Sequence, residues 1–150
     1  MIPVNELSFD GNEKKYLEEC ITSGWVSSEG PFVQKFEETF SSFIGVKHGI
    51  AVCNGTAALE TALFALEVGT GDEVIIPSFT IISCALACIR LGAKPVLVDI
   101  EPEMWTMDVG QIEEKITPRT KVIMAVHIYG RPVNMDKIVL LAKKYNLRVL

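Results

Sequence analysis

The segment Asn54–Ala58 has the residue types that bind a phosphate at the start of a helix. It reads Asn-Gly-Thr-Ala-Ala, follows an apolar run at Ile50–Cys53 and opens a helical pattern at about Thr56–Glu67. Its small side chains leave backbone N–H groups accessible at the positive end of the helix dipole, which attracts anions. The alternative is that Asn54 or Thr56 only caps the helix. The pattern is neither the P-loop, G-x-x-x-x-G-K-S/T, nor the dinucleotide motif, G-x-G-x-x-G, which argues against nucleotide hydrolases and dehydrogenases.

Three more segments follow predicted strands and are expected at the same edge of a sheet. They are Pro77–Ile81, Asp99 and His127–Gly130. In an open parallel sheet the ligand lies beyond the carboxyl ends of the strands, so the residues after each strand are the candidates for chemistry. The helix that begins after Ser78 has an apolar first turn, which could contact the flat face of a ring or could belong to the core.

His127 and Asp99 are the titratable residues at this predicted edge. His127 could donate or accept a hydrogen bond near a ligand, or it could be a satisfied structural group beside Tyr129. Asp99 could orient His127 or cap the turn that follows it at Glu101-Pro102. The spacing of these residues does not establish a Ser/His/Asp or Cys/His triad.

The four cysteines do not form a metal or redox motif. Cys20, Cys53, Cys84 and Cys88 lack the spacing of zinc ligands or of a thioredoxin motif, and all but Cys20 lie in apolar stretches. We expect them to be core thiols. The chain has only two histidines, so we expect no metal site.

Two helices are predicted in residues 1–47, which we assign to an N-terminal helical segment. The first ends at Ser23-Gly24, and the second begins after Gly30-Pro31 and closes at Gly45. The polar loop that joins them carries the aromatic Trp25. One face of the second helix is lined by Phe32, Val33, Phe36, Phe40 and Phe43.

From residue 48 to residue 150, short apolar runs alternate with helical patterns, which predicts βαβ units. The predicted strands are Ile50–Cys53, Val74–Ile76, Pro95–Val98, Val122–Val126 and Arg148–Leu150. The predicted helices lie at about Thr56–Glu67, Thr80–Leu91, Val109–Ile116 and Met135–Tyr145. Apolar runs without alternation suit strands that are covered on both faces. We therefore predict an α/β fold with a mainly parallel sheet and helices on both faces.

Composition and charge favour a folded protein without a nucleic-acid partner. The chain is 49% hydrophobic and 22% charged, and its net charge of −5 comes with no run of Lys or Arg. The N-terminus lacks the pattern of a signal peptide. The longest apolar run, Phe79–Ile89, is shorter than the roughly 20 residues that span a bilayer. We expect a soluble, cytoplasmic protein without a membrane partner.

Six segments carry the most specific local patterns. They are Gly24–Glu37, Asn54–Leu59, Gly71–Thr80, Gly92–Asp99, Ile116–Lys121 and Val126–Gly130. In this order and at these separations, they resemble the DegT/DnrJ/EryC1/StrS family of sugar aminotransferases, which depend on pyridoxal 5'-phosphate (PLP). The resemblance implies a fold-type-I aminotransferase, usually a homodimer with its sites at the interface. Residues 48–150 would then form the first part of the PLP-binding large domain.

The resemblance also implies which residues hold the cofactor. Gly55, Thr56 and Ala57 would bind the PLP phosphate, in agreement with the helix-start argument. Ile81 stands where family members often have an aromatic residue that stacks on the pyridine ring. An isoleucine there keeps apolar contact but loses π stacking, which weakens the contact by about 0.5–1.5 kcal/mol.

The substrate side of the resemblance lies in the Gly24–Gly30 loop and after a later strand. Trp25, Ser27 and Ser28 of the loop, together with His127, would face the sugar substrate. The segments Asp10–Tyr16 and Trp25–Ser28 are most similar to the perosamine synthetase group of the family. That similarity implies amination of C4 of a GDP-linked 4-keto-6-deoxymannose, with glutamate as the amino donor.

The family also uses two groups that these 150 residues do not hold. One is an acid that pairs with the pyridine nitrogen, expected directly after Leu150, and the other is the lysine that forms the Schiff base. We therefore expect no catalytic residue within the chain and an N-terminal part that is inactive alone. Two alternatives stay open: a PLP-dependent sugar dehydratase with a His at the lysine position, and a truncated, non-catalytic protein that binds a ligand or a partner.

Overall fold

The computed structural model describes residues 2–3 and 5–150, and the chain forms two compact units, residues 1–51 and 52–150. The first unit holds two helices that match the prediction. α1 spans Glu13–Ser23 and α2 spans Pro31–Ile44. Each ends at a glycine with a left-handed backbone, Gly24 at φ 76° and Gly45 at φ 78°. Glycine adopts this conformation without steric cost, so both helices end sharply.

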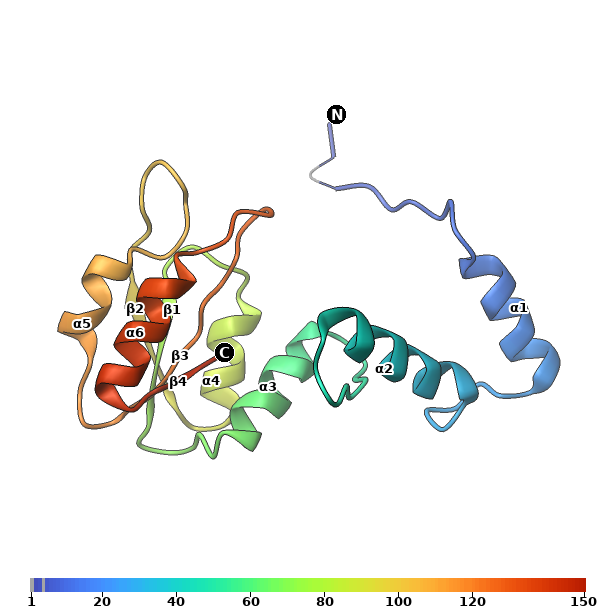
Figure 1. The fold of residues 1–150 in the computed structure, drawn as a ribbon, viewed down its shortest axis with the longest axis horizontal. Coiled ribbons are helices and arrows are strands. Elements are labelled where there is room, and N and C mark those ends of the chain that lie inside the picture. The colour runs from blue at the N-terminus through green and yellow to red at the C-terminus, as the bar shows by residue number, and fades with distance from the viewer. Residues whose placement is uncertain (1, 4) are drawn as a thin grey trace. The chain divides into compact units, whose positions relative to one another are not determined.

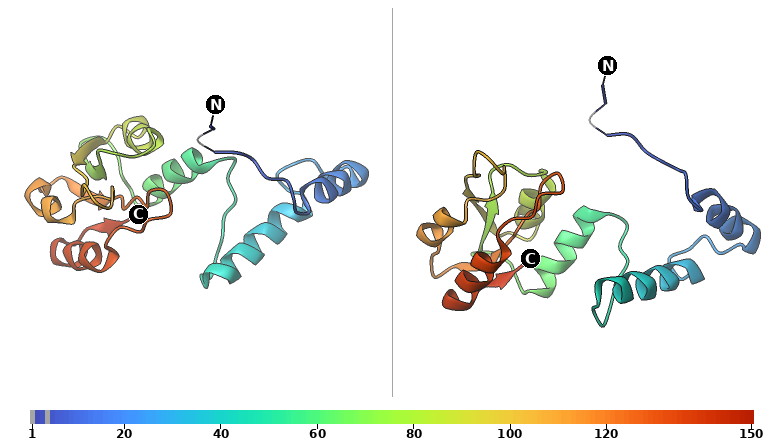
Figure 2. Two further views of the ribbon diagram at one scale, coloured as in Figure 1. Left: turned by 90° about the horizontal axis from the view of Figure 1, so that it is seen from above. Right: turned by 45° about the horizontal axis from the view of Figure 1, so that its top comes forward.

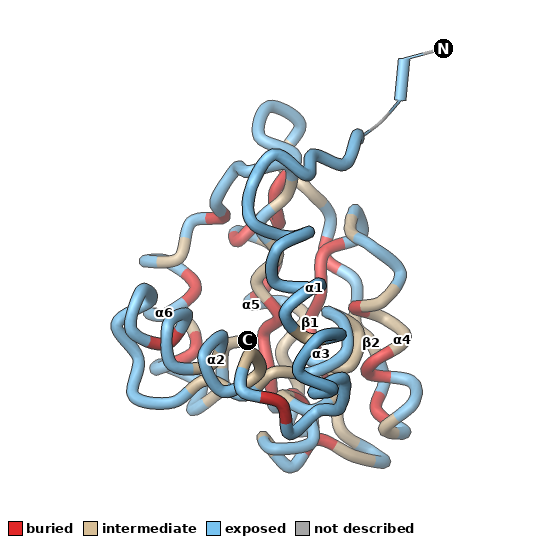
Figure 3. Tube along the Cα trace, turned by 90° about the vertical axis from the view of Figure 1, so that its right-hand side faces the viewer, coloured by how far each residue is buried: buried red, intermediate tan, exposed pale blue. Residues whose placement is uncertain are grey.

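The apolar side chains of these two helices are mostly exposed. No residue of α1 is buried and only Ser41 of α2 is, so both helices are largely blue in Figure 3. Tyr16 and Phe32 pack across the two helices with ring centroids 5.1 Å apart. Phe36 and Phe40 stack at 5.6 Å along α2. The apolar face predicted for the second helix is therefore present, and part of it packs on itself.

Four parallel strands form the sheet of the second unit, in the order β2-β1-β3-β4. The strands are β1 (Glu73–Pro77), β2 (Lys94–Val98), β3 (Thr120–Ile123) and β4 (Arg148–Val149). The helices are α3 (Gly55–Ala65), α4 (Ser83–Arg90), the 3-10 helix η1 (Val109–Gln111), α5 (Ile112–Lys115) and α6 (Met135–Tyr145). The predicted α/β class with a parallel sheet is confirmed.

Helices cover both faces of this sheet. Figure 1 shows α3 and α4 on one side and α5 and α6 on the other, and the turned views of Figure 2 keep α4 and α6 on opposite sides. Successive side chains of β1 point to opposite faces of the sheet. Val74 and Ile76 join the apolar cluster that includes α3 and α4, whereas Ile75 joins the cluster that includes α5 and α6.

The strand predicted at Ile50–Cys53 is wrong. Within the described residues no strand runs beside this segment, and the backbone N–H of Ala51 donates to Glu37 Oε1 at 2.7 Å instead. An extended segment becomes a strand only where a neighbour takes up its backbone hydrogen bonds. Cys53, which was predicted to be a core thiol, is exposed.

The other cysteines lie closer to the prediction. Cys84 and Cys88 are buried in α4, and Cys20 is half-buried. Burial raises the pKa of the Cys88 thiol to about 11, with a further contribution from Cys84. Cys88 therefore stays protonated at neutral pH and acts as a small apolar group. The described residues hold no group of three His, Cys, Asp or Glu placed to bind a metal ion.

The helices of the second unit are short. The helix predicted at about Thr80–Leu91 begins at Ser83, and the one predicted at Val109–Ile116 is the 3-10 helix η1 followed by α5. Among all described helices, none combines the length and the hydropathy needed to cross a bilayer.

A buried carboxylate ties the amino ends of the strands together. Glu73 begins β1 and is 2% exposed. Its Oε2 accepts a hydrogen bond from the Thr117 hydroxyl at 2.6 Å, its Oε1 accepts one from Arg119 Nη2 at 3.0 Å, and Lys94 Nζ lies 3.5 Å from Oε1. The Thr117 hydrogen bond, followed by that of Arg119, holds the pKa of Glu73 below its ordinary value despite burial. Glu73 thus connects β1 to the start of β2 and to the turn before β3.

We expect Glu73→Gln to lower the free energy of unfolding by about 1–3 kcal/mol at neutral pH, because the hydrogen bonds from Thr117 and Arg119 lose a charged acceptor that lies buried in the fold. The folded-state pKa lies below the ordinary 4.5, so the carboxylate stabilises the fold above pH 4.5 and loses this contribution as the pH falls through the folded-state pKa. Urea unfolding of parent and variant should therefore converge on acidification. Glu114→Gln, at a side chain that is 65% exposed, is the control. A difference that is constant with pH would contradict the assignment.

Candidate functional site

The start of α3 lies beside the start of α4, at the carboxyl end of β1. The Thr56 and Ser83 hydroxyl oxygens are 2.8 Å apart, which joins the first turns of the two helices. Because α4 follows β1 in the chain, this contact brings the predicted phosphate segment to the ligand-binding edge of the sheet. Ser83 was not singled out from the sequence, since only the folded chain shows that it meets Thr56.

Asn54 caps α3. The capping role that the sequence left open for Asn54 or Thr56 therefore belongs to Asn54. Its Oδ1 accepts a hydrogen bond from the backbone N–H of Ala57 at 2.9 Å. Of the three residues predicted to hold a phosphate, Ala57 therefore has its N–H engaged. Among the described residues, no group accepts from the backbone N–H of Gly55 or of Thr56. Capping by Asn54 thus leaves two other backbone donors of the same helix start available to an anion.

The surroundings of these donors are open. A Cβ built on Gly55 would meet no atom within 4 Å, so the approach to the helix start is clear. The Thr56 and Ser83 hydroxyls add two groups that can donate to an anion. Ile81, two residues before Ser83, is 65% exposed and presents an apolar side chain just before α4 begins. The arrangement suits a phosphate attached to a flat ring.

Asp99 and His127 do not form a pair. Asp99 Oδ1 accepts hydrogen bonds from the Ser78 hydroxyl at 3.1 Å and from the backbone N–H of Ile100 at 2.8 Å. His127 Nδ1 accepts from the backbone N–H of Val133 at 3.2 Å. With Nδ1 as the acceptor, the proton of the neutral ring sits on Nε2, and His127 is exposed. Asp99 thus links the ends of β1 and β2, and His127 supports the loop after β3.

Two tight turns at this edge carry aromatic residues in an unusual backbone conformation. In the turn that joins Ile100 to Met107, Trp105 has φ 61° and is 52% exposed. In the hairpin that joins Ile128 to Arg131, Tyr129 has φ 47° and is 76% exposed. Such backbone conformations in residues other than glycine cost about 1–3 kcal/mol each and concentrate at functional sites.

Phe79 joins these two side chains into a cluster. Its ring meets Trp105 edge-on at a centroid distance of 5.6 Å and lies 6.5 Å from the ring of Tyr129. We call Phe79, Trp105 and Tyr129 the aromatic cluster. The two turns are also tied by Arg131, whose Nη1 donates to the backbone oxygen of Glu103 at 2.9 Å. A cavity of about 350 Å³ lies among Glu103, Met104, Trp105, Ile128, Tyr129 and Arg131.

The remaining predicted substrate residues lie in the first unit. Trp25, Ser27 and Ser28 are exposed in the loop between α1 and α2, whereas His127 belongs to the second unit. The loop is a series of turns in which the backbone N–H of Gly30 donates to the oxygen of Ser27 at 3.1 Å. None of these three side chains makes a hydrogen bond to another described residue.

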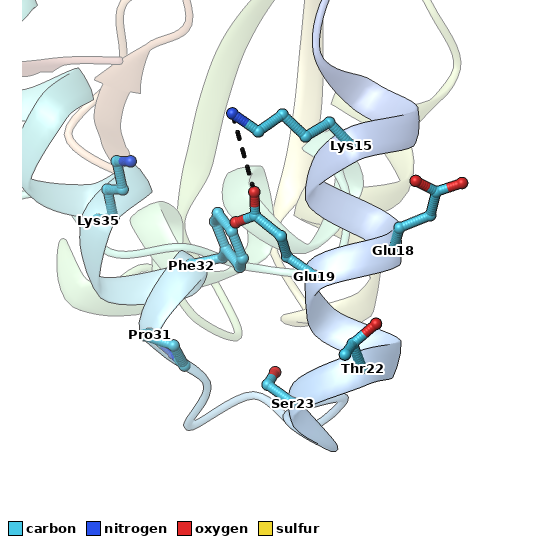
Figure 4. Close-up of a pocket in the computed structure, with 8 residues that line it drawn as sticks. All are labelled: Lys15, Glu18, Glu19, Thr22, Ser23, Pro31, Phe32 and Lys35. Atoms are coloured by element: carbon cyan, nitrogen blue, oxygen red, sulfur yellow. Dashed lines mark ion pairs between the residues drawn. The ribbon is translucent and has the colours of Figure 1, made fainter.

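A groove of about 650 Å³ separates α1 from α2 in the same unit (Figure 4). Lys15 pairs with Glu19 at 3.9 Å, and the Lys35 ammonium lies 5.9 Å from the Phe32 ring centroid. The cations that line the groove are therefore engaged by neighbours from α1 and α2. We attribute the groove to the packing of two helices and not to a ligand site.

A family model matches nearly the whole chain. The model of the DegT/DnrJ/EryC1/StrS aminotransferase family covers residues 8–150. The chain belongs to this family. Members of the DegT/DnrJ/EryC1/StrS family are PLP-dependent sugar aminotransferases. The open start of α3 therefore lies in a chain whose relatives bind a phosphorylated ring.

Individual members of the family show how far the similarity reaches. GDP-perosamine synthase of Caulobacter vibrioides is 49% identical over 141 residues, which are 94% of this chain and 38% of that protein. GDP-perosamine synthase of Escherichia coli O157:H7 is 48% identical over 149 residues, 99% of this chain and 41% of that protein. The chain thus spans about two fifths of the length of these relatives.

Solved structures of the family share the fold. NtdA from Bacillus subtilis, with bound cofactor PMP, superposes with a TM-score of 0.87 at 36% identity, over 91% of this chain and 31% of that chain. The fold is that of fold-type-I sugar aminotransferases, as predicted, and the match covers about a third of their chains.

Aspartate caps a helix as well as asparagine does, so it separates capping from anion binding at α3. We expect Asn54→Asp to leave the free energy of unfolding within about 0.5 kcal/mol but to weaken PLP binding about tenfold, because its carboxylate repels the phosphate. Asn134, which caps α6 by accepting from Lys137 N at 3.1 Å, provides the matched control Asn134→Asp. Urea unfolding and equilibrium dialysis of PLP measure the two effects. Equal affinities in both variants would place the phosphate elsewhere.

Proposed function

We propose that this chain is the N-terminal part of an enzyme that transfers an amino group from glutamate to a keto carbon of a nucleotide-linked deoxy sugar. C4 of GDP-4-keto-6-deoxymannose is the proposed position. The observation that carries the proposal is the identity of 49% to a GDP-perosamine synthase over 94% of the chain. Relatives named for dTDP- and UDP-linked sugars are 46% and 48% identical but match only 89% and 76% of the chain, whereas the two GDP-perosamine synthases match 94% and 99% of it, which supports GDP as the nucleotide.

The start of α3 fits the PLP phosphate. The N–H groups of Gly55 and Thr56 have no acceptor among the described residues, and the dipole of the 11-residue helix α3 favours a negative charge there. We propose that both N–H groups and the hydroxyls of Thr56 and Ser83 hold the phosphate. Ala57 contributes a small side chain that leaves room, because its N–H is occupied by Asn54.

Ile81 is proposed to contact one face of the cofactor ring. When bound, PLP supplies the conjugated ring that accepts electrons during amino transfer. The role of this chain is to fix that ring: the phosphate site anchors one end, and Ile81 limits tilting from the side. Isoleucine offers dispersion contact without the stacking of an aromatic side chain.

His127 and the loop between α1 and α2 are proposed to meet the substrate. The Nδ1 atom of His127 is engaged by Val133, so Nε2–H is the group that can donate to a sugar oxygen. Trp25, Ser27 and Ser28 supply an apolar ring and two hydroxyls, a common combination for sugars. The lysine and the acid that the family uses are proposed to lie in a longer protein that contains this chain, which we propose to be a homodimer.

The deciding experiment supplies the longer protein with PLP, glutamate and GDP-4-keto-6-deoxymannose. We expect an amino sugar nucleotide, detected by mass spectrometry. We also expect one equivalent of 2-oxoglutarate, measured by its coupled enzymatic reduction. Residues 1–150 alone serve as the control and should give no product. Loss of a sugar hydroxyl without incorporation of nitrogen would instead identify a dehydratase, and no turnover of any keto sugar nucleotide would refute the proposal.

Replacement of Ile81 tests the position of the ring. We expect Ile81→Tyr to tighten PLP binding by about 0.5–1.5 kcal/mol, because it restores stacking on an exposed position that has room for a larger side chain. Ile82 is 66% exposed beside it, so Ile82→Tyr is the matched control and should leave the affinity unchanged. Dissociation constants from the visible absorption of the bound cofactor measure both variants. A weaker affinity in Ile81→Tyr would contradict ring contact.

A further inference from the structure

We propose that the aromatic cluster, together with Glu103 and Arg131, binds the guanine base of a nucleotide. This proposal rests on the nucleotide-sugar function proposed above and gives the cluster a role, binding the base, that neither the sequence patterns nor the comparisons assign to it. It starts from the two strained turns and the cavity of about 350 Å³ between them. That volume lies within the range of sites for small ligands.

The strain of the turns points to a role for the side chains that they present. The hairpin that holds Tyr129 has positive φ at both central residues, with Gly130 at φ 78°, and Ile128 and Arg131 exchange backbone hydrogen bonds of 3.1 and 2.8 Å. Such a turn strongly prefers Asn-Gly. A tyrosine in the first position gives up this preference and holds a largely exposed ring at the tip of the turn. Trp105, in the loop between Ile100 and Met107, likewise combines a positive φ of 61° with a side chain that is 52% exposed.

The shape of the cluster suits a flat, aromatic ligand. Phe79 meets Trp105 edge-on with an interplanar angle of 86° and so braces the indole, while the indole and the Tyr129 ring both line the cavity. Bases stack on such rings, and removal of one stacking ring usually costs binding about tenfold to a hundredfold.

The polar groups of the cavity select guanine among the bases. Arg131 uses Nη1 for the Glu103 backbone oxygen, and among the described residues its Nε and Nη2 have no acceptor. An arginine fork matches the O6 and N7 acceptors of guanine. The Glu103 carboxylate, which pairs with no described cation, can accept from the N1–H and N2 amino group of the same base. Uracil and thymine lack the paired acceptors, and adenine presents a donor in place of O6.

The experiment measures GDP binding to the longer protein by isothermal titration. We expect Trp105→Asn and Tyr129→Asn each to weaken GDP binding about tenfold to a hundredfold, while the melting temperature stays level or rises, because asparagine tolerates the left-handed backbone. A purely structural role for these rings would lower the melting temperature instead. Tyr129→Phe keeps the ring and should retain most of the affinity. Phe64→Ala, at an exposed phenyl group of α3 outside the cluster, is the matched control and should leave GDP binding unchanged.

Selectivity provides a second, independent measurement. The parent protein should bind GDP at least about tenfold more tightly than UDP, and more tightly than IDP, which lacks the N2 amino group. Glu103→Gln should abolish the preference for GDP over IDP, and Arg131→Lys should weaken GDP binding because it loses the planar fork. Failure of GDP to bind, or unchanged affinity in both asparagine variants, would overturn the base site.

The two proposals fail in different ways. Amination of a UDP- or dTDP-linked keto sugar, with ring variants that behave like the parent, would refute the guanine site and leave the aminotransferase proposal standing. GDP binding that depends on Trp105 and Tyr129, without any amine product, would support the base site and refute the proposed reaction.

Discussion

The central strand β1 is the constraint on which the second unit depends. All five of its residues are buried, and it is hydrogen-bonded to β2 on one side and to β3 on the other. Parallel pairing requires the carboxyl ends of these strands to meet at one edge. Because α4 follows β1 directly, the edge gathers Ser83, Ile81 and Phe79, and the contact of Ser83 with Thr56 adds the start of α3.

Much of this arrangement could be predicted from the sequence, because it rests on local patterns. Apolar runs and helix periods located the four strands of the sheet, and small residues at Gly55–Ala57 indicated an open helix start. The prediction was wrong at Ile50–Cys53, where pairing depends on a neighbour that no local pattern reports. The meeting of Thr56 with Ser83 and the grouping of the aromatic cluster are long-range contacts, and Trp105 carries no sequence signal for a positive φ.

The helix start of α3 is capped by a residue of the chain itself. Asn54 satisfies one backbone donor from within the chain and leaves two for an anion, so the helix does not need the ligand in order to be capped. Binding to such a preformed site costs little ordering entropy. The turns at Trp105 and Tyr129 differ from this cap, because their positive φ angles cost folding free energy. That cost is the consequence of holding these two side chains in place.

Glu73 and Pro77 stand at opposite ends of the same strand, which is five residues long. The hydrogen bonds of the Glu73 carboxylate lie at the amino end. Every residue of the second unit that we propose to bind a ligand follows the carboxyl end of a strand or opens a helix beside one. We therefore expect substitutions at the amino end to change mainly the stability of the fold. Substitutions at the carboxyl end should change mainly which ligand binds. Related proteins can therefore change substrate through substitutions at the carboxyl ends of the strands, while the hydrogen-bonded carboxylate at the amino ends stays the same.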